Sequence, residues 1–277
     1  MEFRNRKRGA TNNMPLPTPE QRVTANLTID SFVSEILYRN SSYPSIRWLY
    51  NREHDFGKGT CAIIGSGATL VGRGQGAAID AHGDVIRVNR LPTNRTHWRD
   101  VGRRTSVWFS KMCRLKPFRV GHGAALRLLV MDSKLKTGDS EDTPIGYCPL
   151  DGPAVRCPFR AFVAMGKKHK KNATDVDKCF GAGMRSLSSR QSSAVRVGIA
   201  SEARFDAAIA MRHGREASMG LHALLTFAPH CRGGVRLYGF SGNGTTDGHH
   251  IGHALTIEHA LMAELMRRSE GRIQIVP

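Results

Sequence analysis

The pattern of apolar and polar positions divides the chain into short β-branched runs that alternate with amphipathic stretches. The apolar runs are nearly continuous in apolar character, which is typical of strands buried on both faces. Ser or Thr stands at the start of each amphipathic stretch, where helix N-caps are favoured. We expect strands at residues 61–65, 85–89, 105–110, 125–131, 194–200, 235–240 and 273–276, and helices at 18–38, 201–212, 218–228 and 256–268.

This alternation predicts an α/β fold, a Rossmann-like and mostly parallel sheet flanked by helices. Ligands of such sheets bind beyond the carboxyl ends of the strands, where the strand order reverses. Residues 1–17 are polar, basic and interrupted by Pro, so we expect a tail there and one domain over 18–277. Within that domain, about 134–193 is rich in Gly, Pro, Lys and Ser, and we expect an irregular insertion there.

Composition narrows the class of protein further. A hydrophobic content of 40% with 23% charged residues is that of a globular domain, and no apolar run approaches the roughly 18 residues of a membrane-spanning helix. The net charge of +18 would suit a nucleic-acid binder, but the arginines are scattered. The one dense basic run, residues 167–171, has no aromatic residues on which bases could stack. We therefore expect no nucleic-acid partner, no membrane span and no targeting segment in this chain.

The cysteines and glycosylation sequons bear on the compartment. The six cysteines include no CxxC pair, so their spacing gives no support for zinc, whereas an even number of widely spaced cysteines is compatible with disulfides and a secretory compartment. N-x-[ST] sequons favour the same compartment, and they occur at Asn26, Asn40, Asn94, Asn172 and Asn243.

A glycine-rich turn follows the expected strand at 61–64. Its sequence, Gly65-Ser66-Gly67-Ala68, is of the kind whose backbone N–H groups can approach a phosphate. A dinucleotide-binding turn would need a third glycine where Leu70 stands and an acidic residue about 20 positions on, for which Asp80 and Asp84 are the candidates. Leu70 disfavours that reading.

Four stretches in order resemble the motifs of the eukaryotic, animal-type sialyltransferases, a family like glycosyltransferase family 29. Residues 61–76, 79–80, 85–93 and 100–105 are similar to its long motif, and Ser218-Met219-Gly220 with Cys231 and 235–240 to its small motif. His249-His250 matches the third motif, and His253-x4-Glu258 the fourth.

The resemblance implies the GT-A-variant sialyltransferase type of fold, a Cys61–Cys231 disulfide that joins the two larger motifs, and a glycoprotein of the Golgi lumen. It also implies an enzyme that transfers sialic acid from CMP-sialic acid to a glycan hydroxyl, such as that of a galactoside, on a glycoprotein or glycolipid. The transfer would invert the anomeric carbon and would need no metal and no cofactor.

By the same resemblance, His253 would be the base and His250 would contact the donor phosphate. The CMP portion would be held by Gly65, Ser66, Gly67, Asn89, Ser218, Met219 and Gly220. Glu258 would have a structural or orienting role. The chemistry agrees, because a neutral imidazole can accept the proton of a hydroxyl, and imidazoles, helix N-termini and backbone amides can meet the growing charge of a leaving phosphate.

Alternative readings remain open. His249 and His253 have the spacing of metal ligands on a helix, although Gly248 and Gly252 disfavour a helix there. Asp175 and Asp177 could hold a cation, but a solvated loop is favoured. The donor could instead be CMP-Kdo or another CMP-3-deoxy sugar. Only two residues separate His250 from His253, where the family has a longer loop, so an inactive glycan- or nucleotide-binding relative is also an alternative.

Overall fold

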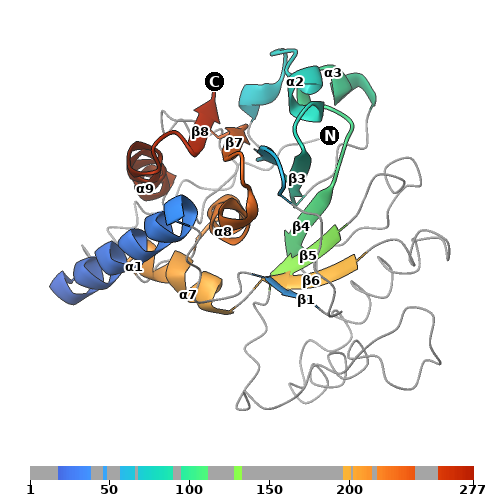
Figure 1. Cartoon of the computed structure of the whole chain (residues 1–277). Helices are drawn as coiled ribbons and strands as arrows, with labels where there is room; N and C mark the ends of the chain where they lie inside the picture. The colour runs from blue at the N-terminus through green and yellow to red at the C-terminus, as the bar shows by residue number, and fades with distance from the viewer. Residues whose placement is uncertain are drawn as a thin grey trace, which may run out of the picture.

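The structure is a computed structural model of the chain (Figure 1). It describes residues 18–38, 46–48, 57–65, 68–89, 95–111, 128–132, 196–200, 202–213, 217–240 and 255–277. The expected tail at 1–17 and the expected insertion at about 134–193 lie outside these residues, so the predicted domain division stays a prediction.

The described strands form one eight-stranded sheet in the order β1-β6-β5-β4-β3-β2-β7-β8. All neighbouring pairs are parallel except β1 with β6 at one edge. The predicted α/β fold with a mostly parallel sheet is therefore confirmed. The strands are β1 (Ile46–Trp48), β2 (Cys61–Ile64), β3 (Asp84–Val88), β4 (Val107–Lys111), β5 (Leu128–Asp132), β6 (Arg196–Ala200), β7 (Val235–Tyr238) and β8 (Ile273–Val276).

Side chains of β2 point alternately into two separate apolar clusters, one on each face of the sheet. Cys61 and Ile63 belong to the larger cluster, and Ala62 and Ile64 to the smaller. Four helices supply the larger cluster, and Figure 1 shows them grouped on one side of the sheet. They are α1 (Pro19–Tyr38), α7 (Glu202–Met211), α8 (Met219–Phe227) and α9 (Leu255–Arg268). Burial on both faces explains why the strands read as continuous apolar runs.

Helix α8 lies at the centre of the larger cluster. It contacts β2 and β3 on one side and α7 on another, and nearly all of its residues are buried. The smaller cluster contains Leu70 and Ile79, which precede β3, and the short helices α2 (Gly76–Asp80) and α3 (Trp98–Val101) pack on each other. Among the described residues, none of the helices combines the length and the apolar character that crossing a bilayer requires.

The expected strands and the four long helices are all present, with ends that differ by up to three residues. Two corrections concern strand ends. Asn89 lies outside β3 because its φ of 61° is left-handed, and Gly239, with a φ of 72°, ends β7 before Phe240. Antiparallel β1, α2 and α3 have no counterpart in the sequence prediction, since they are too short for a periodic pattern.

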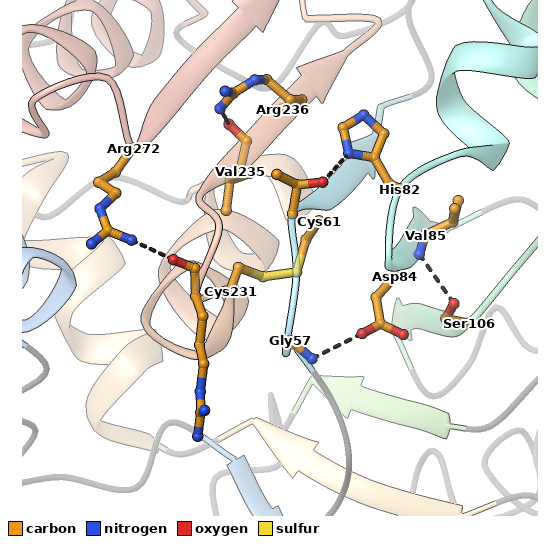
Figure 2. The surroundings of a disulfide bond; sticks show 12 residues. Gly57, Cys61, His82, Asp84, Val85, Ser106, Cys231, Val235, Arg236 and Arg272 are labelled. Atoms are coloured by element: carbon orange, nitrogen blue, oxygen red, sulfur yellow. Dashed lines mark hydrogen bonds between the residues drawn. A yellow bond between two sulfur atoms is a disulfide. The ribbon is translucent and has the colours of Figure 1, made fainter.

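Cys61 and Cys231 form a disulfide with a Cα–Cα distance of 5.8 Å (Figure 2). Cys61 is the first residue of β2, and it stands in register with Val235, the first residue of β7. The bond therefore joins the amino ends of two adjacent central strands. The predicted pairing is confirmed.

Backbone and carboxylate hydrogen bonds surround the disulfide at this end of the sheet. The N–H of Gly57 donates to Asp84 Oδ2 over 2.8 Å, and the N–H of Arg232 donates to the Gly57 carbonyl over 2.8 Å. Figure 2 shows Gly57 and Asp84 beside the bond. The disulfide and these hydrogen bonds all lie at the amino ends of the strands, so the carboxyl ends of β2 and β7 carry no covalent link.

We expect the Cys61→Ala/Cys231→Ala double variant to be less stable than the wild type. The disulfide closes a loop with a sequence separation of 170, for which the chain-entropy model gives about 5 kcal/mol of stabilisation. Urea unfolding with and without dithiothreitol measures the difference. Reductant should lower the wild-type midpoint towards that of the variant, and equal midpoints of the oxidised wild type and the variant would contradict the expectation.

Candidate functional site

The strand order reverses between β2 and β7. From β2 the chain runs outward through β3, β4, β5 and β6, and then returns to place β7 on the other side of β2. In sheets of this kind the crevice between the two carboxyl ends at the reversal is the place where ligands bind. Here those ends are Ile64 and Tyr238, and each is followed by a glycine, Gly65 and Gly239.

The two turns after these strands touch each other through their glycines. The N–H of Gly65 donates to the Tyr238 carbonyl over 2.8 Å, and a Cβ on Gly65 would lie 2.9 Å from the carbonyl oxygen of Gly239. A Cβ on Gly239 would lie 2.9 Å from Leu70 Cδ1. The close approach therefore requires glycine at position 65, whereas at position 239 the φ of 72° favours glycine.

The ring of Phe240 connects this glycine corner to the start of α8. A Cβ on Gly65 would lie 3.2 Å from Phe240 Cε2, and a Cβ on Gly220 would lie 2.7 Å from Cε1 of the same ring. Ser218 is the N-cap of α8, and its hydroxyl accepts from the Leu221 N–H over 3.2 Å. The positive end of the α8 dipole thus lies beside the glycine turn.

A buried carboxylate joins the start of α9 to the start of α8. Glu258 Oε1 accepts from the Ser218 N–H over 2.6 Å and pairs with Arg212 Nη1 at 2.8 Å. The side chains of Arg212 and Glu258 are 1% and 2% exposed. In sequence, His253 stands two residues before Leu255, the first residue of α9.

Asn89 stands at the carboxyl end of β3, the strand next to β2. Its N–H donates to the Phe109 carbonyl over 2.8 Å, and its carbonyl accepts from Trp108 Nε1 over 3.2 Å. These bonds hold the left-handed backbone of Asn89. Its side-chain oxygen, Oδ1, is buried and makes no hydrogen bond with any residue that the structure describes.

The structure places some of the sequence-predicted site residues together. Gly65 and Gly220 both lie against the ring of Phe240, and Ser218 and Met219 directly precede Gly220 at the start of α8. Asn89 lies at the end of β3, the strand next to β2. The other predicted site residues, which lie outside the described residues, are Ser66, Gly67, His250 and His253. The alternative metal ligands His249, Asp175 and Asp177 lie outside them too. Within the described ranges, no three His, Cys, Asp or Glu side chains are grouped as metal ligands. The roles of all these residues stay predictions.

The two acids considered for dinucleotide binding serve the backbone instead. Asp80 accepts from the N–H groups of Arg103 and Arg104 at 2.9–3.1 Å. Asp84 is the first residue of β3 and accepts from Gly57 at the amino end of the sheet. Neither carboxylate lies at the carboxyl end of β3, where a ribose-binding acid belongs. The structure therefore gives no support to a dinucleotide site.

Arg87, a charged residue within the buried β3, has a structural role that sequence analysis missed. Its Nη2 donates to the Val101 carbonyl over 2.7 Å and its Nε to Thr105 Oγ1 over 3.0 Å. Burial lowers the pKa of the Arg87 guanidinium to about 10, opposed by the charge of Asp80, so the group stays protonated at neutral pH. A lone Arg in a Val-Ile-Arg-Val run was the available signal, because such a group needs buried partners.

His82 links the two central strands on the smaller-cluster face of the sheet. Its Nδ1 lies 2.9 Å from Thr60 Oγ1 and its Nε2 lies 3.0 Å from the Tyr238 hydroxyl. Desolvation, followed by the charges of Arg236 and Arg104, holds the pKa of His82 below its ordinary value of 6.5. The native fold therefore favours the neutral ring.

The chain is thus an α/β protein of the open parallel-sheet class, with a glycine and a helix N-terminus near the reversal point of the sheet. In this class such features are where phosphate groups are commonly bound. One part of the chain matches a family model. Residues 25–117 match the model of glycosyltransferase family 29 (sialyltransferase). The resemblance is confirmed over these residues, which contain the long motif.

Individual relatives cover different parts of the chain. Over 57 residues the chain is 37% identical to beta-galactoside alpha-2,6-sialyltransferase 2 of Xenopus tropicalis. The aligned residues make up 21% of this chain and 11% of that protein. The solved structure of a mammalian sialyltransferase matches 96% of this chain and 87% of its own, with 16% identity and a TM-score of 0.48. A second solved structure, of a mammalian sialyltransferase in complex with Gal-beta-1-3GalNAc-ortho-nitrophenol, matches 95% of this chain and 87% of its own, with 15% identity and a TM-score of 0.48.

We expect the free energy of unfolding to fall as the pH is lowered through 6.5. The unfolded chain binds a proton at its histidines near that pH, whereas folded His82, with its lowered pKa, does so only at a lower pH. The loss should therefore begin near pH 6.5 and level off below the folded pKa. Urea unfolding between pH 5 and 8 measures the unfolding free energy, and His82→Gln should make it depend less steeply on pH. An unchanged pH dependence in this variant would contradict the contribution of His82.

We expect Gly65→Ala to destabilise the protein by about 1–3 kcal/mol, the usual cost of overpacking, because its Cβ would press on the Gly239 carbonyl. Gly59→Ala is the matched control just before the other end of β2, since a Cβ there would lie 3.9 Å from Gly83 Cα, an ordinary contact. Thermal unfolding of both variants measures the difference. Similar melting temperatures would show that the glycine corner tolerates a side chain.

Proposed function

We propose that this protein transfers a sialic acid from CMP-sialic acid to a glycan hydroxyl, with a galactoside as the acceptor. The observation that carries the proposal is the meeting of three chain segments at the reversal point of the sheet. Gly65 comes from the first motif, Ser218 and Gly220 come from the second, and Glu258 fixes the first turn of the helix that follows His250 and His253. These are the segments on which the family resemblance rests.

The donor side of the proposal places CMP over this corner. The N-terminus of α8, capped at Ser218, offers a positive dipole to the phosphate, and Met219 and Gly220 supply amides of its first turn. The turn of Gly65, Ser66 and Gly67 supplies further amides. Asn89 Oδ1, a buried acceptor without a partner among the described residues, suits a ribose hydroxyl or the cytosine amino group.

The chemical step of the proposal is one displacement. His253 takes the proton of the acceptor hydroxyl as its oxygen bonds to the anomeric carbon, and the bond from that carbon to the phosphate oxygen breaks. CMP leaves with the electron pair, and its phosphate charge is met by His250 and the start of α8. Attack from the face opposite CMP inverts the anomeric carbon. Because protein donors meet the leaving charge, the proposed step uses no metal.

The proposal extends to the compartment. A disulfide between Cys61 and Cys231 persists where the surroundings are oxidising, as in the secretory pathway, and the family resemblance points to the Golgi lumen. Asn26 of the Asn26-Leu27-Thr28 sequon is exposed on α1, so it is accessible for glycosylation. The other four sequon asparagines lie outside the described residues.

We expect the purified protein to release CMP from CMP-sialic acid in the presence of galactosides, equally with and without EDTA. His253→Ala should lower kcat by about a hundredfold or more, which is within the range for the loss of a general base. Chromatographic measurement of CMP and of the sialylated product tests both expectations. His97→Ala is the matched control, because His97 is exposed in the 3-10 helix Arg95–His97 and should leave kcat unchanged.

Parallel reactions separate the alternatives. Transfer from CMP-Kdo but not from CMP-sialic acid would correct the donor. Binding of CMP without release from either donor, and without any effect of His253→Ala, would establish an inactive binding protein and overturn the proposed transfer. Loss of activity with EDTA that zinc or manganese restores would contradict the metal-free step.

A further inference from the structure

Two buried ion pairs attach α7 and the residue that follows it to other helices. Arg204, within α7, pairs with Glu35 of α1, and their side chains are 8% and 9% exposed. Arg212, directly after α7 ends at Met211, pairs with Glu258 of α9. Both pairs join an arginine in or directly after α7 to a glutamate of another helix, and both are buried. Of the two glutamates, only Glu258 also accepts a hydrogen bond from the start of α8.

The position of Arg212 is fixed by its own backbone. Its N–H donates to the carbonyls of Ala208 and Ile209, over 3.3 and 3.2 Å, so the residue completes the last turn of α7. From there the guanidinium reaches Glu258 Oε1, the same oxygen that accepts from the Ser218 N–H. One carboxylate oxygen therefore pairs with a guanidinium at the end of α7 and accepts a hydrogen bond from the backbone at the start of α8.

Stability alone does not explain this arrangement. Burying an arginine and a glutamate removes both charges from water, and replacing such a pair with neutral residues of similar volume is often neutral or stabilising. What the pair does supply is direction, since an oxygen held by an ion pair and by a backbone hydrogen bond has little freedom to move. Glu258 lies in the first turn of α9, five residues after His253 in the sequence.

We propose that Arg212 is a positioning residue for the transfer reaction. By holding Glu258 it fixes the first turn of α9, and with it the point from which the His250–His253 segment departs, against the N-terminus of α8. The base and the donor-phosphate site then keep a constant relation through the reaction cycle. This inference rests on the proposed function, and it concerns a residue that belongs to none of the four motifs.

The test compares two double variants of the full chain. Arg212→Met/Glu258→Gln removes both charges and keeps an amide oxygen that can accept from Ser218, and Arg204→Met/Glu35→Gln makes the same change in the other pair. We expect the first to lower kcat for sialyl transfer at least tenfold while the donor KM changes less than threefold. The second should keep both constants. Urea unfolding, run on both, shows whether the two remain comparably stable.

Conservative single variants sharpen the comparison. Arg212→Lys keeps a positive charge, so it should retain more of kcat than Arg212→Met. Equal kcat values for the two double variants would overturn the proposal and leave the Arg212–Glu258 pair a purely structural contact. A loss confined to the donor KM would also overturn it, because the pair would then act on donor binding rather than on the base.

Amide hydrogen exchange separates a failure of this inference from a failure of the proposed function. The Arg212→Met/Glu258→Gln variant should exchange faster at Ser218 and in the first turn of α9, with α1 unchanged, and the control variant should show the reverse. If the wild type releases no CMP from either donor, the proposed function fails and the transfer role fails with it, whereas unchanged exchange at Ser218 would show that Arg212 holds nothing in place.

Discussion

The contact between Gly65 and Gly239 is the constraint on which the rest of the site depends. Two parallel strands distant in sequence end side by side, and their turns can meet this closely because Gly65 carries no side chain. Phe240 then packs against both Gly65 and Gly220, which sets how closely α8 can approach the corner. A bulkier residue at Gly65 or Gly220 would press on the Phe240 ring that separates the start of α8 from the glycine turn. The candidate site is thus a consequence of close backbone packing more than of particular polar side chains.

Charged residues of the first motif mostly hold its own backbone in place. Asp100 accepts from the N–H groups of Gly72 and Gly74 at 2.9 and 2.8 Å, and Asp80 does the same for Arg103 and Arg104. Backbone hydrogen bonds lower the pKa of Asp100. These carboxylates act on turns that lack a regular partner, because α2 and α3 are too short to satisfy many groups internally. Much of this motif is therefore scaffolding, although the sequence resemblance alone pointed to donor binding.

The sequence predicted the sheet well because its strands are buried on both faces. The run Cys61-Ala62-Ile63-Ile64 can face two apolar clusters only as a strand between two layers, and the same holds for β3. Strand order, the antiparallel β1 and the short α2 could not be predicted, since they depend on contacts between distant segments. Asn89 shows the limit most clearly. Its left-handed backbone, stabilised by Phe109 and Trp108, ends β3 one residue before the apolar pattern indicates.

The covalent and the electrostatic links of the two larger motifs act at opposite ends of the same strands. Cys61–Cys231 joins the amino end of β2 to the segment before β7, and the carboxyl ends of the two strands are held by the hydrogen bond from Gly65 to Tyr238 and by the contact between Gly65 and Gly239. The Glu258 carboxylate acts at the start of α8. A reducing environment therefore weakens the fold without directly removing any group from the crevice. Substitutions at Arg212 or Glu258 have the opposite character, because they alter the crevice and leave the covalent link intact. The two kinds of lesion are separable by experiment, since loss of the disulfide should lower the unfolding free energy, whereas loss of the buried pair should, under the proposed function, lower the rate of transfer.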